Sequence, residues 1–497
     1  MNTLSKKIML FLCCILLVHI SIHAQNEIDA LRFSETDWQG SARFMGAGRA
    51  FGAVGAEFSA LNVNPAAIGL YKKSEVTFTP LTISVYKNNS DYNGTPTLAQ
   101  AVKTNIGSAG IVLAIPGVSS TLWKKIQIGF GFNRINNFNS TFSIEGRNAG
   151  STIGSVFALE ANGNNYVNVE DWESNEAWIA WNSYLINPKQ GSQTEYIPAL
   201  QGVDMSQSSS VTRKGGIDEM IFSIGTNYDD KLFLGATIGV PFINFTENRT
   251  YSEVNDKEGD IYKFQKLNIV DKFRVRSSGI NLKLGVIYQP VDFLRIGVAF
   301  HTPTYYGNVK DYFERQMSSQ YYDMDTSNHE VLYNVTVAPF ANEFNYSLTT
   351  PLRATANVAF FISQRAFISA EYEFADYSMA TMYSGSYNFS EENKTVQNMY
   401  GFSHIARIGA EINLNQIFAL RAGYNYISSP YKDDINDASK HYASLGFGFR
   451  TKYVYGDFAY ALITSKEKYW MFDRAFVNET NNRFLTHRIM LTLGVRF

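Results

Sequence analysis

The sequence contains very little cysteine. Only Cys13 and Cys14 occur among its 497 residues. Both lie in an amino-terminal stretch where a basic pair precedes an apolar run that ends near the small residue Ala24, the pattern of a secretory signal peptide. A retained membrane anchor is the alternative, but the apolar run is short and no stop-transfer charges follow it. We therefore expect residues 1–24 to be removed, which leaves an exported chain without disulfides, thiol catalysts or thiolate metal sites.

Long apolar runs are also missing. Beyond residue 24 no run approaches the ~18 to 20 residues of a transmembrane helix. An excess of one charge is absent as well, because 43 Lys+Arg stand against 45 Asp+Glu, and no basic surplus points to nucleic acid. What the chain does have is 30 Tyr, 36 Phe and 36 Gly, a mixture that favours many strands. If this chain crosses a membrane, it crosses as strands.

Apolar residues alternate with polar or small ones in segment after segment. At the carboxyl end, every second residue from Ile489 to Phe497 is apolar, which indicates a strand with one apolar face. We predict fourteen such strands, at about 74–87, 105–116, 124–142, 216–228, 231–249, 266–289, 292–305, 345–361, 366–378, 402–413, 417–428, 440–450, 454–464 and 485–497.

The connections between these strands alternate between short turns and long polar loops, the largest being 143–215 and 306–344. This alternation is typical of transmembrane β-barrels, and barrel closure leaves no unpaired strand edge in hydrocarbon. A soluble β-sandwich or propeller is the alternative. The loop alternation, the uniformly apolar face and the terminal Phe497, an aromatic of the kind that outer-membrane assembly machinery reads, favour an all-β, fourteen-stranded antiparallel barrel over residues 74–497.

The segment 46–69, GAGRAFGAVGAEFSALNVNPAAIG, is too poor in large side chains to build a core of its own. It precedes the first strand, and a barrel of fourteen strands leaves an interior too wide for its own side chains to fill. We therefore expect this segment to fold inside the lumen. It resembles the amino-terminal hatch of the FadL/TodX family of outer-membrane transporters, in which a Gly-rich GRA element precedes an Asn-Pro-Ala motif. The matching residues are Gly48, Arg49, Ala50, Asn64, Pro65 and Ala66.

The resemblance implies a hatch over residues 25–73 and passive uptake of hydrophobic or amphipathic compounds such as long-chain fatty acids. Capture by the outer loops, binding above the hatch and lateral exit beside a kinked third strand are implied with it. The chain departs from the family at Glu57-Phe58 and in its long 143–215 loop. Both departures bear on the substrate more than on the fold.

The third predicted strand carries a candidate kink. Its lipid-facing register runs through Phe130 and Phe132 and then reaches Arg134, and a lipid-facing arginine near mid-membrane costs about 2–4 kcal/mol. We expect the register to break there by a bulge or kink. The alternative is an arginine that snorkels to the interface. The proposed lateral opening comprises Arg134, Asn136, Asn137 and Phe138.

Charged residues on the inward strand faces are the second group of candidates. Their basic members suit a carboxylate headgroup, and the ones we single out are Lys283, Arg295, Arg353 and Arg421. A structural ladder of paired charges that holds the hatch is the alternative for each. In the long outer loop, Trp178 and Trp181 are candidates for substrate capture, with packing inside the loop as their alternative.

The histidines form no metal or catalytic spacing that we recognise, so we expect no enzyme activity, no metal and no cofactor. The expected location is a Gram-negative-type outer membrane, and the expected partners are a hydrophobic small molecule, outer-membrane lipids and the barrel assembly machinery, with no nucleic acid and a monomeric state. A haem-type receptor, an aqueous porin and a structural or adhesin barrel are the alternative functions. The sequence leaves open whether the substrate is a fatty acid, an aromatic hydrocarbon, haem or another lipid.

Overall fold

The computed structural model describes residues 27–117, 122–148, 150–172, 174–200, 204–255, 264–324, 330–363, 365–432 and 436–497. The expected signal peptide, residues 1–24, lies outside these ranges. Within them, no helix is both long enough and apolar enough to span a membrane.

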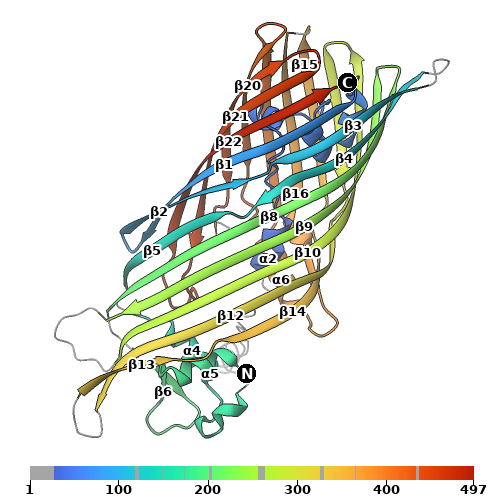
Figure 1. Cartoon of the computed structure of the whole chain (residues 1–497). Helices are drawn as coiled ribbons and strands as arrows, with labels where there is room; N and C mark the ends of the chain where they lie inside the picture. Colours follow the sequence, from blue (N-terminus) through green and yellow to red (C-terminus); the bar gives the residue numbers. More distant parts are fainter. Residues whose placement is uncertain are drawn as a thin grey trace, which may run out of the picture.

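The described residues form a closed antiparallel barrel of fourteen strands, which confirms the predicted fold class. Pairing of the first strand with the last closes the wall, and the tilted strands enclose a long lumen (Figure 1). Some barrel strands consist of successive collinear pieces. In chain order the fourteen are β1 (Glu75–Tyr92), β2 (Thr95–Asn105) with β3 (Ser108–Pro116), β4 (Trp123–Asn137) with β5 (Ser140–Asn148), β8 (Met205–Tyr228), β9 (Leu232–Val254), β10 (Phe264–Val291), β11 (Leu294–His301) with β12 (Tyr305–Met324), β13 (Glu330–Thr336) with β14 (Phe340–Thr349) and β15 (Arg353–Ile362), β16 (Ala366–Asp376) with β17 (Thr381–Tyr383), β18 (Phe402–Asn413), β19 (Phe418–Ile427), β20 (Lys440–Arg450), β21 (Val454–Tyr469) and β22 (Thr480–Arg496).

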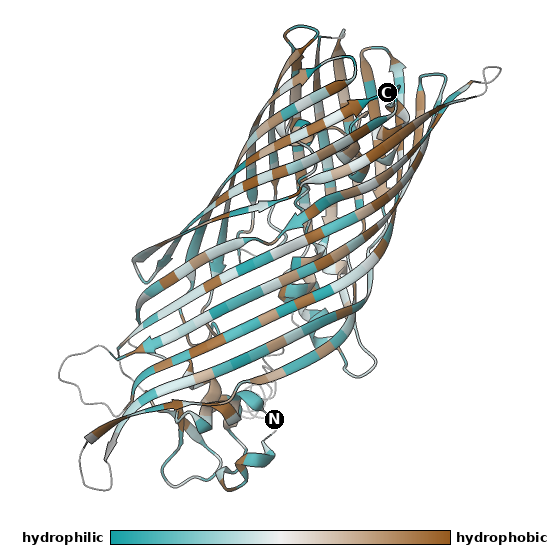
Figure 2. Cartoon of the chain, viewed as in Figure 1, coloured by the Kyte–Doolittle hydropathy of each residue, from teal (hydrophilic) through white to brown (hydrophobic). Residues whose placement is uncertain are grey.

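The two ends of the barrel differ. Tight connections and the carboxyl terminus lie at one end, here called the short-turn end, and longer connections lie at the other, the long-loop end (Figure 1). Outward side chains near the short-turn end are apolar, as at Ile489, Leu491 and Leu493 of β22. Figure 2 shows hydrophobic and hydrophilic residues alternating along the strands, as a wall with two different faces requires.

The amino-terminal residues 27–71, here called the lumen segment, lie inside the barrel (Figure 1). They contain α2 (Glu27–Ser34), α3 (Ala42–Gly46), and the 3-10 helices η1 (Phe58–Asn62) and η2 (Pro65–Leu70). Most of their side chains are buried. The expectation that this small-residue segment folds within the lumen is confirmed.

Two connections at the long-loop end have structure of their own. The segment between β5 and β8 holds α4 (Gly154–Ala161), η3 (Tyr166–Asp171), α5 (Asn175–Asn182), β6 (Ile186–Pro188) and β7 (Tyr196–Pro198), and is here called the cap. The connection after β16 holds η4 (Tyr377–Met379) and α6 (Ser390–Met399), and α6 packs against α2 of the lumen segment.

The predicted strand boundaries at the long-loop end are wrong. The expected loop 306–344 is largely strand, since β12 runs to Met324 and β13 begins at Glu330. The expected loop 143–215 shortens in the same way, because β5 reaches Asn148 and β8 begins at Met205. Beyond the apolar band a strand has no lipid-facing residues to mark it, so its polar pairs resemble loop in the sequence.

Candidate functional site

The Asn-Pro-Ala motif begins a short helix. Asn64 caps η2 with its side-chain Oδ1, which accepts a hydrogen bond from the backbone N of Ala66 at 3.0 Å. Pro65 occupies the first helical position, where its missing N–H costs nothing. The Asn64 Nδ2 then donates to Asn357 Oδ1 of the wall at 3.0 Å. The motif therefore both starts the helix and fixes it to the barrel.

A patch of inward-facing glycines receives this helix. A Cβ added to Gly235 would lie 2.2 Å from the Pro65 carbonyl oxygen, and one added to Gly285 would lie 2.0 Å from Asn64 Oδ1. The lumen segment thus approaches the wall so closely that only glycine fits at these two positions. We call Gly225, Gly235 and Gly285 the first glycine seat.

A second glycine seat receives the other motif from a different part of the wall. A Cβ on Gly409 of β18 would meet the Ala47 carbonyl oxygen at 2.0 Å, and one on Gly423 of β19 would meet the Gly48 nitrogen at the same distance. Gly409 and Gly423 are directly paired across the ladder. The small residues of segment 46–69 therefore pack closely against small residues of the wall.

Arg49 joins the second glycine seat to Asp37, a carboxylate that several side chains contact. It has φ +64°, its guanidinium pairs with Asp37 at 2.7 Å, and it lies over the ring of Tyr442 at 4.2 Å. Asp37 also accepts from Tyr442 at 3.0 Å and pairs with Arg488 of β22 at 3.3 Å. Ala50, the last residue of the GRA element, is fully buried. These contacts hold the lumen segment to β20 and β22.

The four basic candidates for a substrate headgroup lie in contact with the lumen segment or with carboxylates that bind it. Arg353 donates to the Ser34 carbonyl at 2.6 Å, and Arg295 to the Val54 carbonyl at 2.8 Å. Arg353 also pairs with Glu373 at 3.0 Å.

The other two candidates act through a wall carboxylate. Lys283 pairs with Glu219, which accepts from Asn62 of η1 at 3.1 Å. Arg421 pairs with Glu411 at 2.6 Å, and Glu411 also pairs with Arg43 of α3 at 2.9 Å. Since these buried charges already have partners, the geometry favours the structural alternative, in which they hold the lumen segment.

The second and third barrel strands both break at the same level. The ladder between β3 and β4 ends at the pair Ser108 and Asn133. Further toward the long-loop end, β2 pairs with β1 and β5 pairs with β8, and no ladder joins β2 to β5 among the described residues. The register between β4 and β8 shifts between Arg134 and Asn136. The two strands still lie side by side, and we call this stretch without a ladder, between residues 95–105 and 140–148, the β2–β5 window.

Residues of the lumen segment occupy the edge that β4 presents at this break. The Asp37 nitrogen donates to the Ile135 carbonyl at 2.7 Å, and the Gln39 nitrogen donates to the Arg134 carbonyl at 3.0 Å. Asn136 Nδ2 donates to the carbonyl of Glu35 at 2.8 Å. Backbone groups that lost their strand partner are thus satisfied from inside the barrel, as buried polar groups must be.

The remaining residues singled out at the kink have distinct positions. Arg134 forms a two-pronged ion pair with Asp218 of the neighbouring β8, with both distances 2.8 Å. Asn137 Nδ2 reaches Asn105 Oδ1 of β2 at 3.5 Å. Phe138 points inward, where its ring meets Phe33 and Phe245 at centroid distances of 5.8 and 5.2 Å. An apolar aromatic group therefore lies directly inside the window.

The window is closed at its long-loop side. Tyr92, fully buried at the tip of β1, covers Gly146 of β5 and donates to Gln207 of β8 at 2.8 Å. Beside it, Asn93 Nδ2 donates to the Arg147 carbonyl at 2.8 Å. The window is thus a bounded interruption in the wall, between the kink at one side and this bridge at the other.

The cap packs its tryptophans into a hydrophobic cluster that it shares with the barrel wall. Trp181 stacks on Tyr166 and meets Trp172 and Tyr196 edge to face, and Trp178 packs against the same cluster. The helix that carries them is tied to the wall by Glu176, which pairs with Arg315 of β12 at 2.7 Å. This arrangement favours the packing alternative for Trp178 and Trp181.

A buried carboxyl makes the cap sensitive to pH. Burial raises the pKa of Glu160 in α4 to about 8, and the nearby Glu176 carboxylate adds to the rise. Because the folded cap holds this proton more tightly than the unfolded chain, its stability is full below the ordinary value of 4.5 and falls as pH rises through about 8.

We expect amide exchange in α4 and α5, corrected for intrinsic rates, to quicken between pH 6 and pH 8.5. Glu160→Gln removes the titrating group and should flatten this dependence. An unchanged pH profile in the variant would contradict the assignment to Glu160.

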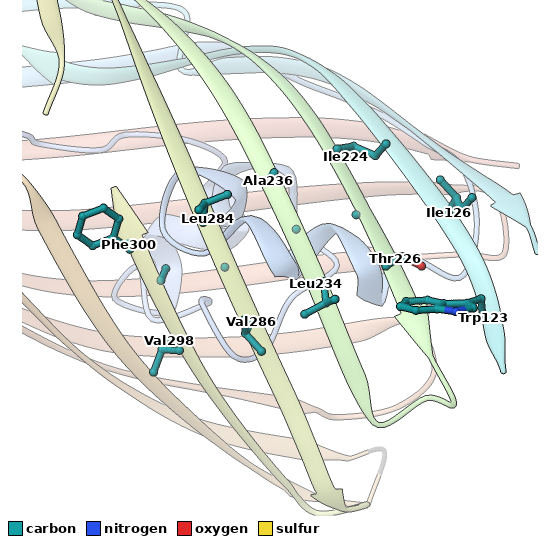
Figure 3. A pocket seen from close by; sticks show the side chains of 14 residues that line it. Trp123, Ile126, Ile224, Thr226, Leu234, Ala236, Leu284, Val286, Val298 and Phe300 are labelled. Atoms are coloured by element: carbon teal, nitrogen blue, oxygen red, sulfur yellow. The ribbon is translucent and has the colours of Figure 1, made fainter. Parts of the chain in front are cut away.

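An apolar groove lies on the outer surface. Its volume is about 740 Å³, and it lies outside the first glycine seat across β4 and β8 to β11. Figure 3 shows its apolar side chains, including Ile224, Leu284 and Val298, on the strands, with helical turns of the lumen segment behind them. A second outer groove lies over Gly409 and Gly423. Both belong to the apolar outer face.

Two histidines of the barrel wall face outward and pair with tyrosines. The Nδ1 atoms of His441 and His487 lie 2.7 and 2.8 Å from the hydroxyls of Tyr424 and Tyr460. In the part of the chain that the structure describes, no cluster of three or more His, Cys, Asp or Glu side chains could hold a metal ion.

Sequence reasoning missed the glycine seats and the contact between residues 35–39 and the kink. The inward glycines were visible as members of alternating strands, and their enrichment on inward positions was the available signal. Nothing local marks residues 37–39 as partners of β4, because the contact joins distant parts of the chain.

No protein-family model matches the chain, and no curated protein matches it in sequence. Several solved structures are similar in fold, including the following two. A Pseudomonas aeruginosa FadL homologue is 14% identical with a TM-score of 0.53, over 93% of this chain and 98% of that one. The P. putida toluene transporter TodX is 13% identical with a TM-score of 0.52, over 93% and 99%. The chain therefore has the fold of the FadL and TodX barrels, with the lumen segment in the place that the sequence resemblance implies.

Proposed function

We propose that the protein carries hydrophobic or amphipathic compounds passively across an outer membrane. The observation that carries the proposal is the β2–β5 window, where the hydrogen-bonded ladder between two neighbouring wall strands is interrupted, combined with a lumen filled by residues 27–71. An aqueous porin has no use for a filled lumen. A compound soluble in lipid can leave through the wall instead.

The surroundings of the window support an apolar route. On the outer side, Val102 and Leu98 of β2 are strongly exposed, by 62% and 74%. Val102 pairs with Val85 of the apolar band, and Leu98 pairs with Asn89, at the headgroup edge of the window. On the inner side lie the rings of Phe33, Phe138 and Phe245. A molecule that moves between them meets apolar side chains on the β2 side of the window and inside it, which lowers the cost of leaving the lipid, whereas the outward residues of β5, such as Thr141 and Ser143, are polar. In this route the cap admits the compound, the aromatic group binds it, and displacement of residues 35–39 widens the opening.

Long-chain fatty acids are the first candidate substrate, and monoaromatic hydrocarbons are the second because TodX is named as a toluene transporter. Haem is less favoured by the geometry. Among the described histidines, His301 faces the lumen, and its ring nitrogen already contacts the Val63 carbonyl at 3.0 Å. We propose no enzyme activity and no cofactor.

Uptake by cells tests this function. Cells that lack their own hydrophobic-compound transporters and produce this protein should take up a radiolabelled long-chain fatty acid or toluene severalfold faster than cells without it. Uptake of a labelled disaccharide should stay unchanged. A porin would raise disaccharide entry, and a structural or adhesin barrel would raise neither, so either result contradicts the proposal.

A further inference from the structure

Two clusters of basic side chains stand on the outer face of the wall at the long-loop side. The first consists of Lys87 on β1, Lys466 on β21 and Arg483 on β22, and the second of Arg274 and Arg276 on β10 and Lys310 on β12. All six side chains are exposed. We call them the first and second outer basic clusters.

Each cluster contains two like charges placed directly opposite one another. Lys466 is the ladder partner of Arg483, and Arg276 is the ladder partner of Lys310. Directly opposed like charges on one sheet face destabilise the pairing. The wall avoids this arrangement nearby, since Lys272 stands opposite Glu314 and pairs with it at 2.6 Å.

Among the described residues, the opposed charges have no ion-pair partner. None of Lys466, Arg483, Arg276 and Lys310 forms an ion pair with any residue that the structure describes. Asp437 acts electrostatically on Lys466, and the rest of the charge of the two clusters is left unpaired within the described residues. Each opposed pair of exposed basic side chains is suited to an anion that lies between them.

The position of the two clusters along the barrel wall indicates which anion they meet. On β22 the outward residues from Val495 to Leu485 are apolar apart from His487, and Arg483 follows directly. On β1, Val85 ends the apolar series and Lys87 follows it. On β10, Ile280 ends it, and Arg276 lies beyond the bulge between Arg276 and Gly279. Both clusters thus lie immediately beyond the apolar band, at the level where lipid headgroups meet a transmembrane barrel.

We propose that the two outer basic clusters bind phosphate groups on the headgroups of membrane lipids in the leaflet at the long-loop end. Lys and Arg side chains are the usual phosphate ligands of proteins, and a phosphate between two opposed cations turns their repulsion into attraction. The inference rests on the membrane location in the proposed function and adds the partner chemistry at its outer surface.

Charge reversal within each opposed pair provides the test. The variant Lys466→Glu/Lys310→Glu turns both like-charge pairs into opposite-charge pairs. Because the repulsion disappears, its Tm in an uncharged maltoside detergent should exceed that of the parent protein. Lys124→Glu, which makes one such change at an exposed position of the short-turn end, is the control and should not gain stability in this way.

Lipid with phosphorylated headgroups should reverse the order of the Tm values of the variant and the parent protein. In nanodiscs that contain bis-phosphorylated lipid A, the parent protein should gain several degrees in Tm over nanodiscs with the dephosphorylated lipid, and this gain should shrink at high salt. The variant should lose most of the gain, and the control should keep it. The Lys466→Glu/Lys310→Glu variant should also retain severalfold less lipid phosphorus after purification than the parent protein.

Equal Tm values in the two lipids for the parent protein would overturn the proposal. An equal gain from inorganic phosphate alone, in detergent, would also overturn it, because the clusters would then bind free phosphate rather than lipid. Fatty-acid uptake by the variant should match the parent. The lipid assignment and the transport function can therefore fail separately.

Discussion

Replacing Gly235 with valine is expected to displace the Asn64–Ala66 turn and make the barrel conduct ions. The added Cβ would overlap the Pro65 carbonyl, which lies 2.2 Å from it, and backbone at that distance cannot yield as a flexible side chain can. Overpacking in a tight site costs about 1–3 kcal/mol. Movement of the lumen segment relieves the overlap, whereas the wall is held by its ladders on both sides.

Planar-bilayer recording measures this effect. The Gly235→Val protein should show a conductance at least several-fold above the parent, and deletion of residues 41–69 should show the largest conductance. Gly456→Val is the matched control, because a Cβ there would meet no atom closer than 3.7 Å. Heat-modified mobility on gels verifies that each barrel is assembled. Parental conductance in an assembled Gly235→Val barrel and in the deletion would show that the lumen segment does not block the pore.

Substituting Asn136 and Asn137 with valine is expected to reduce uptake severalfold while leaving binding largely intact. Asn136 donates to the Glu35 carbonyl, and Asn137 reaches Asn105 across the break. Valine removes these bonds and favours regular strand pairing. A straightened third strand narrows the β2–β5 window, while the cap and the rings of Phe33 and Phe245 keep their places.

The comparison uses equal surface abundance and a radiolabelled long-chain fatty acid. Asn244→Val/Asn248→Val is the control, since both asparagines lie on the continuously paired strand β9. The control should transport as the parent does. If the Asn136/Asn137 variant transports normally, or if binding and uptake fall together, passage straight through a displaced lumen segment becomes the better account.

Strand number and the lumen segment could be predicted because both depend on local patterns. Alternation along β22 and the Gly- and Ala-rich composition of 46–69 follow from the chemistry on each side of a barrel wall. The strand ends at Met324 and Met205 could not be predicted, since outside the apolar band both faces are polar and alternation disappears.

Residue roles were harder to predict than the fold. The basic residues chosen as headgroup ligands are inward, as their strand positions indicate, but Arg421 and Lys283 have partners that only the closed barrel brings near. The register break at Arg134 could be placed from the cost of a lipid-facing charge. The contact of the break with Asp37 and Gln39 could not be predicted, because these residues are far from β4 in the sequence and only the fold brings them together.

The route itself can be followed with a fatty acid that carries a photoreactive diazirine near its methyl end. Cells that produce the protein would be illuminated during uptake, and the labelled residues identified by mass spectrometry. The account predicts labelling of Phe138 and of the rim of the β2–β5 window, such as Leu98 and Val102, and a loss of the rim labels in the Asn136→Val/Asn137→Val variant. Labels confined to the lumen segment and the short-turn end, with none on the rim, would contradict lateral exit through the wall.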